Sequence, residues 1–409
     1  MGLYTRATIV GRPTNSILKV IALDDLLRSD FNTEHCALWV DDNPALARSR
    51  AIEELSWGAL LHVGTAHPSP RESTCHISQL RAPATIAPGD VIAVRADKGL
   101  ITSLYRRGSK SNALLVTERC NSYCLMCSQP PLERDESDRV DELIATVRLM
   151  DRDEQVLGIT GGEPTLLGED LFRLFGEIRT CLPTTALHVL SNGRRFKDRT
   201  FAKSAVAAAP RETLWAIPLY SDSPDIHDFV VQSEGAFKET LNGLWNLAGE
   251  SAHVELRVVL QRAVIPRIRQ LAHFIARNLS FVKHVAWMGL EPMGFAKPNW
   301  KSIWADPHAY TDTLAEAVEK LDHFGVATSV FNLPLCVLPA SLRPYATQSI
   351  SDWKNVYLDE CATCSARNKC CGFFSSATGM YLPKSVHALK DDIEPEPSSQ
   401  HGVPHAVTV

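Results

Sequence analysis

The chain has 409 residues, about 2.7 times the guide length of a single domain, so two or three domains are expected. Its hydrophobic fraction of 45%, charged fraction of 22% and net charge of −5 are ordinary globular values, and they exclude wholesale disorder and a strongly basic nucleic-acid binder. The first residues lack the apolar core of a signal peptide, and no window approaches the length of a membrane span. We therefore expect a cytoplasmic protein with neither nucleic acid nor membrane as a partner.

Residues 1–105 are predicted to form a small α+β domain. A helix-like stretch at 43–60 precedes short strands such as Asp90–Val94, which follows a Pro-Gly turn. The polar run 106–111 has the composition of a linker.

From Asn112 onward, short apolar runs alternate with amphipathic stretches, which is typical of repeated βα units and a parallel sheet. Six strands are expected, at 113–117, 155–160, 186–190, 213–220, 254–260 and 283–290, with helices near 138–150, 168–180, 197–208, 236–248, 265–278 and 308–324. The pattern predicts an α/β fold with a partial (β/α)6 TIM-like barrel over residues 112–325, whose reactive groups lie on loops at the carboxyl ends of the strands. A cysteine-rich extension at 326–385 follows. The tail 390–409, with its acids, prolines and serines, is predicted to be disordered.

Three of the eleven cysteines, Cys120, Cys124 and Cys127, lie within eight residues directly after the first barrel strand. Soft thiolates select iron–sulfur clusters, zinc or copper(I), and three local ligands leave a coordination position for a substrate or cofactor. The alternative is a zinc site whose fourth ligand lies elsewhere. Cysteines that occur singly are expected to pack as small buried side chains: Cys36, Cys75 and Cys181.

A C-x-x-x-C-x-x-C loop followed by Gly161-Gly162-Glu163 after the second strand resembles the radical S-adenosylmethionine (SAM) superfamily. The resemblance implies that Cys120, Cys124 and Cys127 bind a [4Fe-4S] cluster whose fourth iron is left for the amino and carboxylate groups of SAM. It also implies reductive cleavage of SAM and abstraction of a hydrogen atom from the substrate. Many relatives have an aromatic residue before the third cysteine, whereas this chain has Met126.

The cofactor should be held by residues at the ends of successive strands. Consecutive glycines cost backbone entropy, which predicts close approach of Gly161 and Gly162 to a ligand, here the methionine ammonium group of SAM. His227 is expected to be a structural hydrogen-bonding group rather than a proton donor. The further candidates follow from the resemblance or from position: Met126 for adenine, Glu163, Asn192 and Ser221 for the cofactor, Arg257 and Gln261 for its carboxylate or ribose, and Gly289, Glu291 and Gly294 as lining of the same cavity.

A second group of cysteines occupies the C-terminal extension. Cys361, Cys364, Cys370 and Cys371 lie within eleven residues, and Cys336 lies 25 residues upstream of the first of them. A closed four-thiolate site is expected, with Cys336 preferred to Cys371 as its fourth ligand because neighbouring cysteines rarely converge on one metal. Structural zinc requires the same four ligands. Resemblance to the SPASM and twitch extensions of radical SAM enzymes favours a second [4Fe-4S] cluster.

Most of the chain resembles the C-type maturases of His-Xaa-Ser peptide-modification systems. Three features carry this resemblance: the N-terminal domain, the string from Thr117 to Pro131 and the Cys370–Phe374 segment. The likeness implies a ribosomally made His-Xaa-Ser repeat substrate, peptide recognition by residues 1–105, a second radical SAM enzyme as partner, and flavodoxin or ferredoxin as electron donor. Two alternatives remain open. One is a radical SAM enzyme acting on a small-molecule cofactor or nucleotide precursor, and the other is a non-catalytic zinc-binding scaffold.

Overall fold

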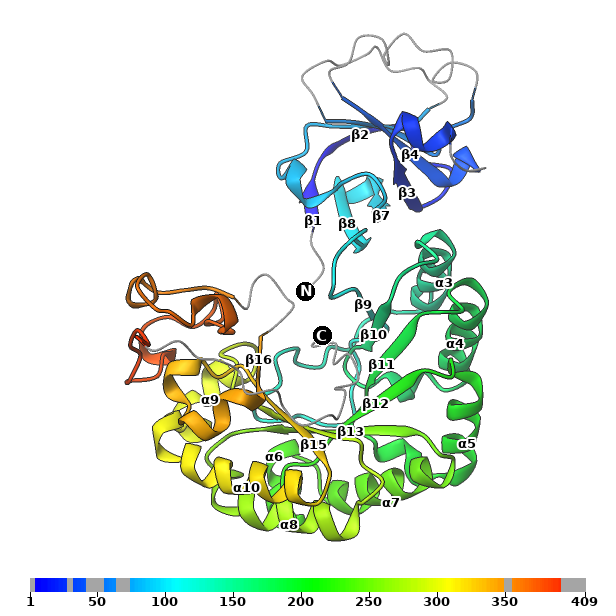
Figure 1. Ribbon diagram of the computed structural model, residues 1–409. Coiled ribbons are helices and arrows are strands. Elements are labelled where there is room, and N and C mark those ends of the chain that lie inside the picture. Colours follow the sequence, from blue (N-terminus) through cyan, green and yellow to red (C-terminus); the bar gives the residue numbers. More distant parts are fainter. Residues whose placement is uncertain (1–3, 28–31, 42–54, 64–73, 349–354, 391–409) are drawn as a thin grey trace. The chain divides into compact units, whose positions relative to one another are not determined.

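The computed structural model describes residues 4–27, 32–41, 55–63, 74–348 and 355–390 (Figure 1). Its contacts divide the chain into two compact units. One unit comprises Met1–Leu114, Ser137–Gln155 and Leu174–Thr185, and the other comprises Leu115–Glu136, Val156–Arg173 and Ala186–Val409. The predicted disordered tail lies outside the described residues, apart from Lys390.

The first unit contains an eight-stranded mixed sheet with the strand order β1-β8-β7-β3-β4-β5-β6-β2. The central strands β3, β4, β5 and β6 run parallel, while β7, β8, β1 and β2 join by antiparallel pairing. Its core is a layer of fully buried aliphatic side chains that includes Leu18, Leu61, Ile77 and Ile101. The strands are β1 (Tyr4–Arg6), β2 (Thr8–Val10), β3 (Ile17–Ile21), β4 (Cys36–Val40), β5 (Ala59–His62), β6 (His76–Ser78), β7 (Val91–Arg95) and β8 (Leu100–Tyr105).

The helix expected at 43–60 lies mostly outside the described residues, and its last two residues are in a strand instead. Ala59 and Leu60 begin β5, which pairs with parallel neighbours on both sides. All four residues of this strand are buried. A strand covered on both faces reads as a continuous apolar run, and periodicity alone does not separate such a run from a buried helical segment.

The polar run 106–111 is held more firmly than a solvated linker would be. Within the first unit, the Arg107 guanidinium forms two hydrogen bonds to Asp151, which also accepts from Lys19. The Arg107 backbone amide donates to Asp90 at 3.0 Å. The run is therefore anchored to the buried carboxylate of Asp90 and the half-buried carboxylate of Asp151.

The second sheet also has eight strands, in the order β16-β15-β14-β13-β12-β11-β10-β9, and every pair from β10 to β16 is parallel. Each successive strand is added beside the previous one, as repeated βα units require. The strands are β9 (Ala113–Leu115), β10 (Val156–Thr160), β11 (Ala186–Leu190), β12 (Thr213–Pro218), β13 (His253–Val259), β14 (His284–Met288), β15 (Ala327–Phe331) and β16 (Ala346–Thr347). The prediction of a mixed α/β fold with a parallel sheet is confirmed.

The described sheet has two strands beyond the six expected, because the chain re-enters it after α10. β15 is a fully paired strand of five residues, whereas β16 has two. Both strands lie beyond residue 325, within the segment predicted to be the cysteine-rich extension.

The helices of this part of the chain follow the strands, and Figure 1 shows α5, α7, α8 and α10 along the outside of the curved sheet. In α8, Ile268 is buried, and the buried residues Leu271, Ala272 and Ile275 lie three, four and seven residues after it, as on one face of an amphipathic helix, and this face packs inward. Two short helices, α6 and α9, were not expected. The α-helices are α3 (Arg139–Leu149), α4 (Glu169–Cys181), α5 (Arg199–Ala208), α6 (Pro224–Val231), α7 (Ala236–Gly249), α8 (Ile268–Asn278), α9 (Ala296–Ile303) and α10 (Thr311–His323).

Each helix of the described chain falls short, in length or in apolar character, of what a bilayer-spanning helix requires.

Candidate active site on the cysteine loop

The loop that carries the first three cysteines is held in place by backbone hydrogen bonds from two later segments. Tyr123 and Leu125 donate to the carbonyls of Val231 and Val230 at the end of α6. The Cys127 carbonyl accepts from the Phe295 amide at 2.8 Å, just before α9. A Cβ on Gly294 would lie 2.3 Å from that same carbonyl, so only glycine lets the two segments approach this closely.

The three thiols are half-buried and influence one another. Burial raises the pKa of Cys120 to about 11 and that of Cys124 to about 12. Cys127 adds to both shifts and Cys120 adds to that of Cys124, which places the three sulfurs in one region. Three thiolates in a poorly solvated region need a bound cation to offset their charge, and metal binding would release their protons.

Among the described residues, no three His, Cys, Asp or Glu side chains converge on one point as ligands of a single metal ion do. A cubane cluster makes a different demand, because each of its cysteines binds a separate iron atom.

Gly161 and Gly162 are required by the neighbouring backbone, not only by a prospective ligand. A Cβ on Gly161 would lie 2.4 Å from the Thr117 carbonyl oxygen, and one on Gly162 would lie 2.2 Å from that of Arg119. The amides of Gly162 and Glu163 donate to these same two oxygens at 2.8 Å. The glycines thus let the end of β10 pair tightly with the segment leading into Cys120.

Glu163 is fully buried and its carboxylate accepts four hydrogen bonds. Oε1 accepts from the Thr165 amide, the Thr165 hydroxyl and the Ser191 hydroxyl, and Oε2 accepts from the Asn192 amide at 2.6 Å. Burial raises the pKa of Glu163, and these hydrogen bonds act in the opposite direction. In the structure, Glu163 links the ends of β10 and β11, which places Asn192.

Asn192 faces the cysteine loop, and so does a residue that the sequence prediction missed. The Asn192 side-chain amide donates to Asn121 Oδ1 at 2.6 Å. Arg194 donates to the Asn121 carbonyl and to the buried Ser122 hydroxyl, while its Nε binds Glu239 at 2.7 Å. The guanidinium also lowers the pKa of Cys124. In sequence, Arg194 is one member of an Arg-Arg-Phe-Lys run with no sign of which cation turns toward the loop.

Ser221, just after β12, and His227, on α6, form structural hydrogen bonds. The Ser221 hydroxyl, fully buried, accepts from the Ser223 amide and donates weakly to Asp222. The His227 Nδ1 accepts from the Tyr220 amide at 3.2 Å, and burial lowers the pKa of this imidazole to about 4. His227 is therefore neutral near pH 7 and has the structural role expected of it.

Arg257 and Gln261 are buried side chains that each keep an unpaired polar atom. Gln261 is fully buried; its Nε2 lies 3.6 Å from the Met126 sulfur and its Oε1 has no partner. Arg257 donates to the weakly accepting Met288 sulfur at 3.3 and 3.4 Å, its Nε lies 3.9 Å from Glu255 Oε1, and its Nη1 has no partner among the described residues. An unmet buried donor or acceptor costs about 1–3 kcal/mol, so these two atoms fit a polar ligand.

The other residues placed by position have different surroundings. A Cβ on Gly289 would lie 2.5 Å from the Asn332 carbonyl, so this glycine is needed for packing between the ends of β14 and β15. Tyr220, which we did not predict, is buried beside the loop, and the nearby charges of Cys124 and Cys127 raise its pKa further than burial alone.

The C-terminal thiols form a second group within the same compact unit. Cys370 Sγ accepts from the amides of Leu335 and Gly372, each at 3.4 Å, and Cys364 Sγ accepts from the Leu389 amide at 3.4 Å. The Cys371 thiol is the main reason why the pKa of Cys370 falls to about 6. Cys370 therefore favours the thiolate, whereas burial raises the pKa of Cys336 and of Cys361.

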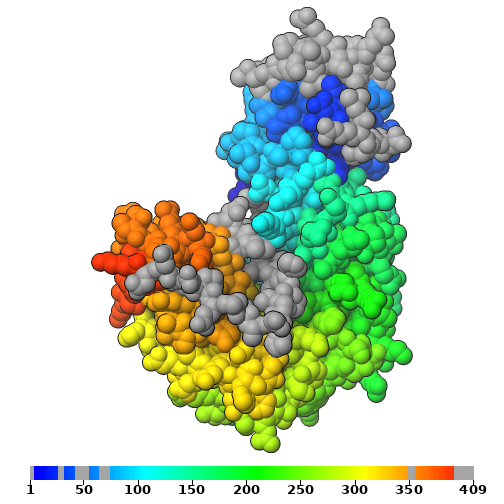
Figure 2. Space-filling view, in the orientation of Figure 1, coloured from blue at the N-terminus to red at the C-terminus, as the bar shows by residue number. Residues whose placement is uncertain are grey.

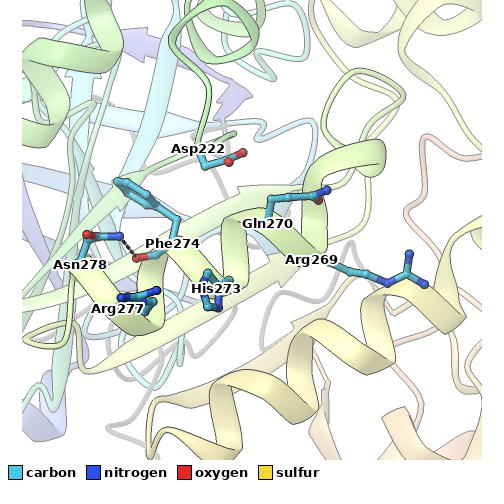
Figure 3. A pocket seen from close by; sticks show the side chains of 7 residues that line it. All are labelled: Asp222, Arg269, Gln270, His273, Phe274, Arg277 and Asn278. Carbon is cyan, nitrogen blue, oxygen red and sulfur yellow. Dashed lines mark hydrogen bonds between the residues drawn. The ribbon is translucent and has the colours of Figure 1, made fainter.

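A groove on the outer face of α8 does not coincide with the cysteine loop. Figure 3 shows its lining, six side chains of α8 together with Asp222, around a volume of about 570 Å³. The Asp222 carboxylate is bound by Arg267, at 2.7 Å from Nε, which holds its pKa low. None of the predicted cofactor residues lines this groove.

Residues 114–261, which run from β9 to the end of β13 and include the cysteine loop, match the family model of the radical SAM superfamily. The chain contains a radical SAM domain. No curated protein matches the chain significantly.

Solved structures similar to this chain include Streptococcus suis SuiB, at 13% identity and a TM-score of 0.41, over 53% of this chain and 48% of that one. A second is anSMEcpe with bound AdoMet, at 16% identity and a TM-score of 0.42, over 53% of this chain and 62% of that one. A third is a radical SAM methyltransferase from Sphaerobacter thermophilus, at 15% identity and a TM-score of 0.41, over 59% and 72%. The chain matches about half the length of SuiB.

A radical SAM domain implies a [4Fe-4S] cluster and SAM, and the side chains of this domain fit both. The loop offers three free thiols, and the unpaired atoms of Arg257 and Gln261 offer a donor and an acceptor. When bound, the cluster supplies the electron that opens the sulfonium group of SAM. The residues of the domain would position the cluster and SAM for this reaction.

Proposed function

We propose that this protein is a radical SAM enzyme that modifies a ribosomally made peptide by hydrogen-atom abstraction. The observation that carries the proposal is the three-cysteine loop of the radical SAM domain, tied by Gly162, Glu163 and Asn192 to the ends of β10 and β11. Cys120, Cys124 and Cys127 would hold the cluster, and Arg257 and Gln261 would bind polar groups of SAM.

A second [4Fe-4S] cluster in the extension forms part of the proposal. Besides burial, the nearby charges of Cys361 and Cys370 raise the pKa of Cys336, and those of Cys364 and Cys370 raise the pKa of Cys361. Cys371 keeps its proton, because Cys370, burial and Cys336 all raise its pKa. This pattern supports Cys336, Cys361, Cys364 and Cys370 as the ligands. The amides of Leu335, Gly372 and Leu389 would tune the cluster's potential, since hydrogen bonds to ligand sulfurs shift reduction potentials.

The family match covers only the radical SAM domain. A peptide substrate is supported in addition by the resemblance of the chain to His-Xaa-Ser maturases. In this proposal residues 1–105 recognise the peptide, residues 112–325 form the catalytic barrel and residues 326–385 hold the second cluster. Flavodoxin or ferredoxin would deliver electrons, and a second radical SAM enzyme would act on the same substrate.

Anaerobic reconstitution tests the proposal. Two cubane clusters predict about 8 irons per chain, and the Cys120→Ala/Cys124→Ala/Cys127→Ala variant should keep about 4 and lose SAM cleavage. Cys181→Ala is the matched control, because this thiol lies on α4 outside both groups and should leave iron and cleavage unchanged.

The substrate is tested by incubating the reconstituted enzyme with SAM, dithionite and a synthetic His-Xaa-Ser repeat peptide. A mass change in the peptide that requires the three cysteines is the expected result. SAM cleavage without any change in peptide mass would contradict the peptide assignment. One zinc per chain without SAM cleavage would contradict radical chemistry altogether.

A further inference from the structure

A second groove, of about 480 Å³, lies where helix α9 meets the C-terminal extension. Its apolar lining includes Trp300, Trp304 and Met380, and its cationic lining consists of Arg262, Lys301 and Lys384. In Figure 2 the orange-to-red surface of the extension lies against the yellow surface formed by residues near 300. No role in cluster or SAM binding has been assigned to these side chains.

The walls of this groove are fixed by contacts from both sides. The rings of Trp300 and Trp304 stack at 4.5 Å with an interplanar angle of 16°, and Tyr381 meets Trp300 edge-on at 4.9 Å. The Lys384 amide donates to Asp306 Oδ2 at 3.0 Å. The groove is thus a built feature in which two distant parts of the chain hold each other.

The groove favours an anionic occupant. Three cations line it against one acid, Asp306, whose carboxylate already accepts from the Lys384 and His308 amides. Arg262 donates through Nη2 to the Trp304 carbonyl at 2.9 Å, which holds its guanidinium at the rim. Lys301, Lys384 and Met380 are exposed, and Met380 has 59% of its surface accessible.

An indole N–H in the wall also lacks an acceptor. Trp300 is only 3% exposed, and its Nε1 has no hydrogen-bond partner. The Trp300 ring already has Trp304 on one face and Tyr381 at its edge, which leaves a poor platform for stacking a nucleotide base.

The groove is joined to the candidate active site through the chain itself. Arg262 directly follows Gln261, whose side chain contacts the Met126 sulfur in the cysteine loop. The Arg262 amide donates to the Ile303 carbonyl at the end of α9, at 2.8 Å. An occupant of the groove that contacts Arg262 would therefore lie one residue from Gln261, whose side chain contacts the cysteine loop.

We propose that this groove binds an acidic segment of the peptide substrate, with an apolar side chain against Trp304 and Met380 and carboxylates near Arg262, Lys301 and Lys384. The inference rests on the proposed peptide substrate. It assigns a docking role to the joint between the barrel and the extension, separate from the site of chemistry.

Fluorescence anisotropy with the full-length, reconstituted protein tests the proposal without turnover. The probes are three labelled synthetic peptides: one of alternating Glu and Leu, one with Lys in place of each Glu, and one with Ser in place of each Leu. Only the Glu/Leu peptide should bind well, and added salt should weaken its binding because exposed charges are screened.

The Lys301→Glu/Lys384→Glu variant should bind the Glu/Leu peptide at least about tenfold more weakly, because reversed charges repel the carboxylates. Met380→Ser should weaken binding without changing its salt dependence. Lys297→Glu is the matched control, since Lys297 is exposed on the same helix but does not line the groove. This variant should bind the Glu/Leu peptide with the affinity of the wild type. Equal iron content and thermal midpoints would show that the variants fold.

Equal affinity for the Glu and Lys peptides, or wild-type affinity in the double variant, would overturn the proposal. Competition by AMP at the groove would assign it to nucleotides and overturn it as well. If the double variant still modifies substrate peptide at the wild-type KM, the groove assignment fails while the proposed function stands. Tight binding at the groove without peptide modification by any form would instead contradict the proposed function.

Discussion

The side-chain amide of Asn192 donates to the side-chain oxygen of Asn121 across 2.6 Å, which joins the end of β11 to the residue that follows Cys120. The Glu163 carboxylate accepts a hydrogen bond from the Asn192 backbone amide, and the Arg194 guanidinium donates one to the Asn121 backbone carbonyl. Side chains from two neighbouring strand ends thus position the cysteine loop through contacts within the protein itself. Pre-organisation of this kind lowers the ordering cost of binding a cluster.

Arg194→Ala should therefore loosen the cysteine loop. The change removes two hydrogen bonds to residues 121 and 122 and a charge that lowers the pKa of Cys124. We expect faster loss of the cluster to a chelator, by roughly 10-fold if about 1.4 kcal/mol of loop positioning is lost. The measurement is the decay of the cluster's visible absorption in anaerobic buffer.

Lys197→Ala is the control for this experiment, because Lys197 pairs with the same Glu239 but does not reach the loop. Its cluster should decay at the wild-type rate. Matching decay in the two variants would show that the Glu239 ion pairs, not Arg194's contacts with the loop, stabilise the cluster.

Gly162→Ala should disrupt the pairing between β10 and the segment before Cys120. Its Cβ would lie 2.2 Å from the Arg119 carbonyl oxygen, a backbone atom that has no rotamer through which to move away. We expect a loss of about 2–4 kcal/mol of stability and a fall in bound iron at the first site. Thermal unfolding and iron analysis of the purified variant measure both.

The contrasting substitution is Gly176→Ala, on helix α4, where a new Cβ meets nothing within 4 Å. It should raise stability by about 0.5–1 kcal/mol, because alanine favours the helix over glycine. A destabilisation as large as that of Gly162→Ala would show that the packing argument is wrong.

His227 should contribute to acid sensitivity. Burial lowers the pKa of its imidazole from 6.5 to about 4, so the unfolded chain takes up a proton before the folded protein does. The stability that neutral His227 confers is fully present above pH 6.5 and is lost as the pH falls toward 4, by about 2 kcal/mol at pH 5.

The comparison is wild type with His227→Asn, whose side-chain oxygen can accept from the Tyr220 amide but does not titrate. Unfolding free energies at pH 7.5 and pH 5 should differ less in the variant. An equal loss in both proteins would assign the acid sensitivity to other groups.

The fourth ligand of the second thiol group is tested by single substitutions. Cys336→Ala should remove the second cluster and lower the iron content from about 8 to about 4 per chain, because three thiolates would remain for a closed site. Cys371→Ala should retain about 8, since Cys371 acts on Cys370 as a buried thiol donor. The reverse result would make Cys371 the ligand.

Sequence alone determined the features that repeat or cluster locally. The six strands expected after residue 112 are present in the second sheet, because short apolar runs between turns are read directly from the chain, and the cysteine loop follows β9 as expected. The three thiols share one region because only a few residues separate them, and His227 has the predicted structural role.

Tertiary structure decided what distant residues do to one another. Gly161 and Gly162 are needed because of the backbone that lies opposite them. The hydrogen bonds of Glu163, and the contact of Arg194 instead of its neighbours with the cysteine loop, also depend on distant segments. Local sequence patterns carry no information about these contacts. The groove at Trp300 and Lys384 likewise exists only because residues some 80 positions apart pack together. Local spacing fixes which atoms are close along the chain, while packing alone selects which buried polar atoms find partners and which are left for a ligand.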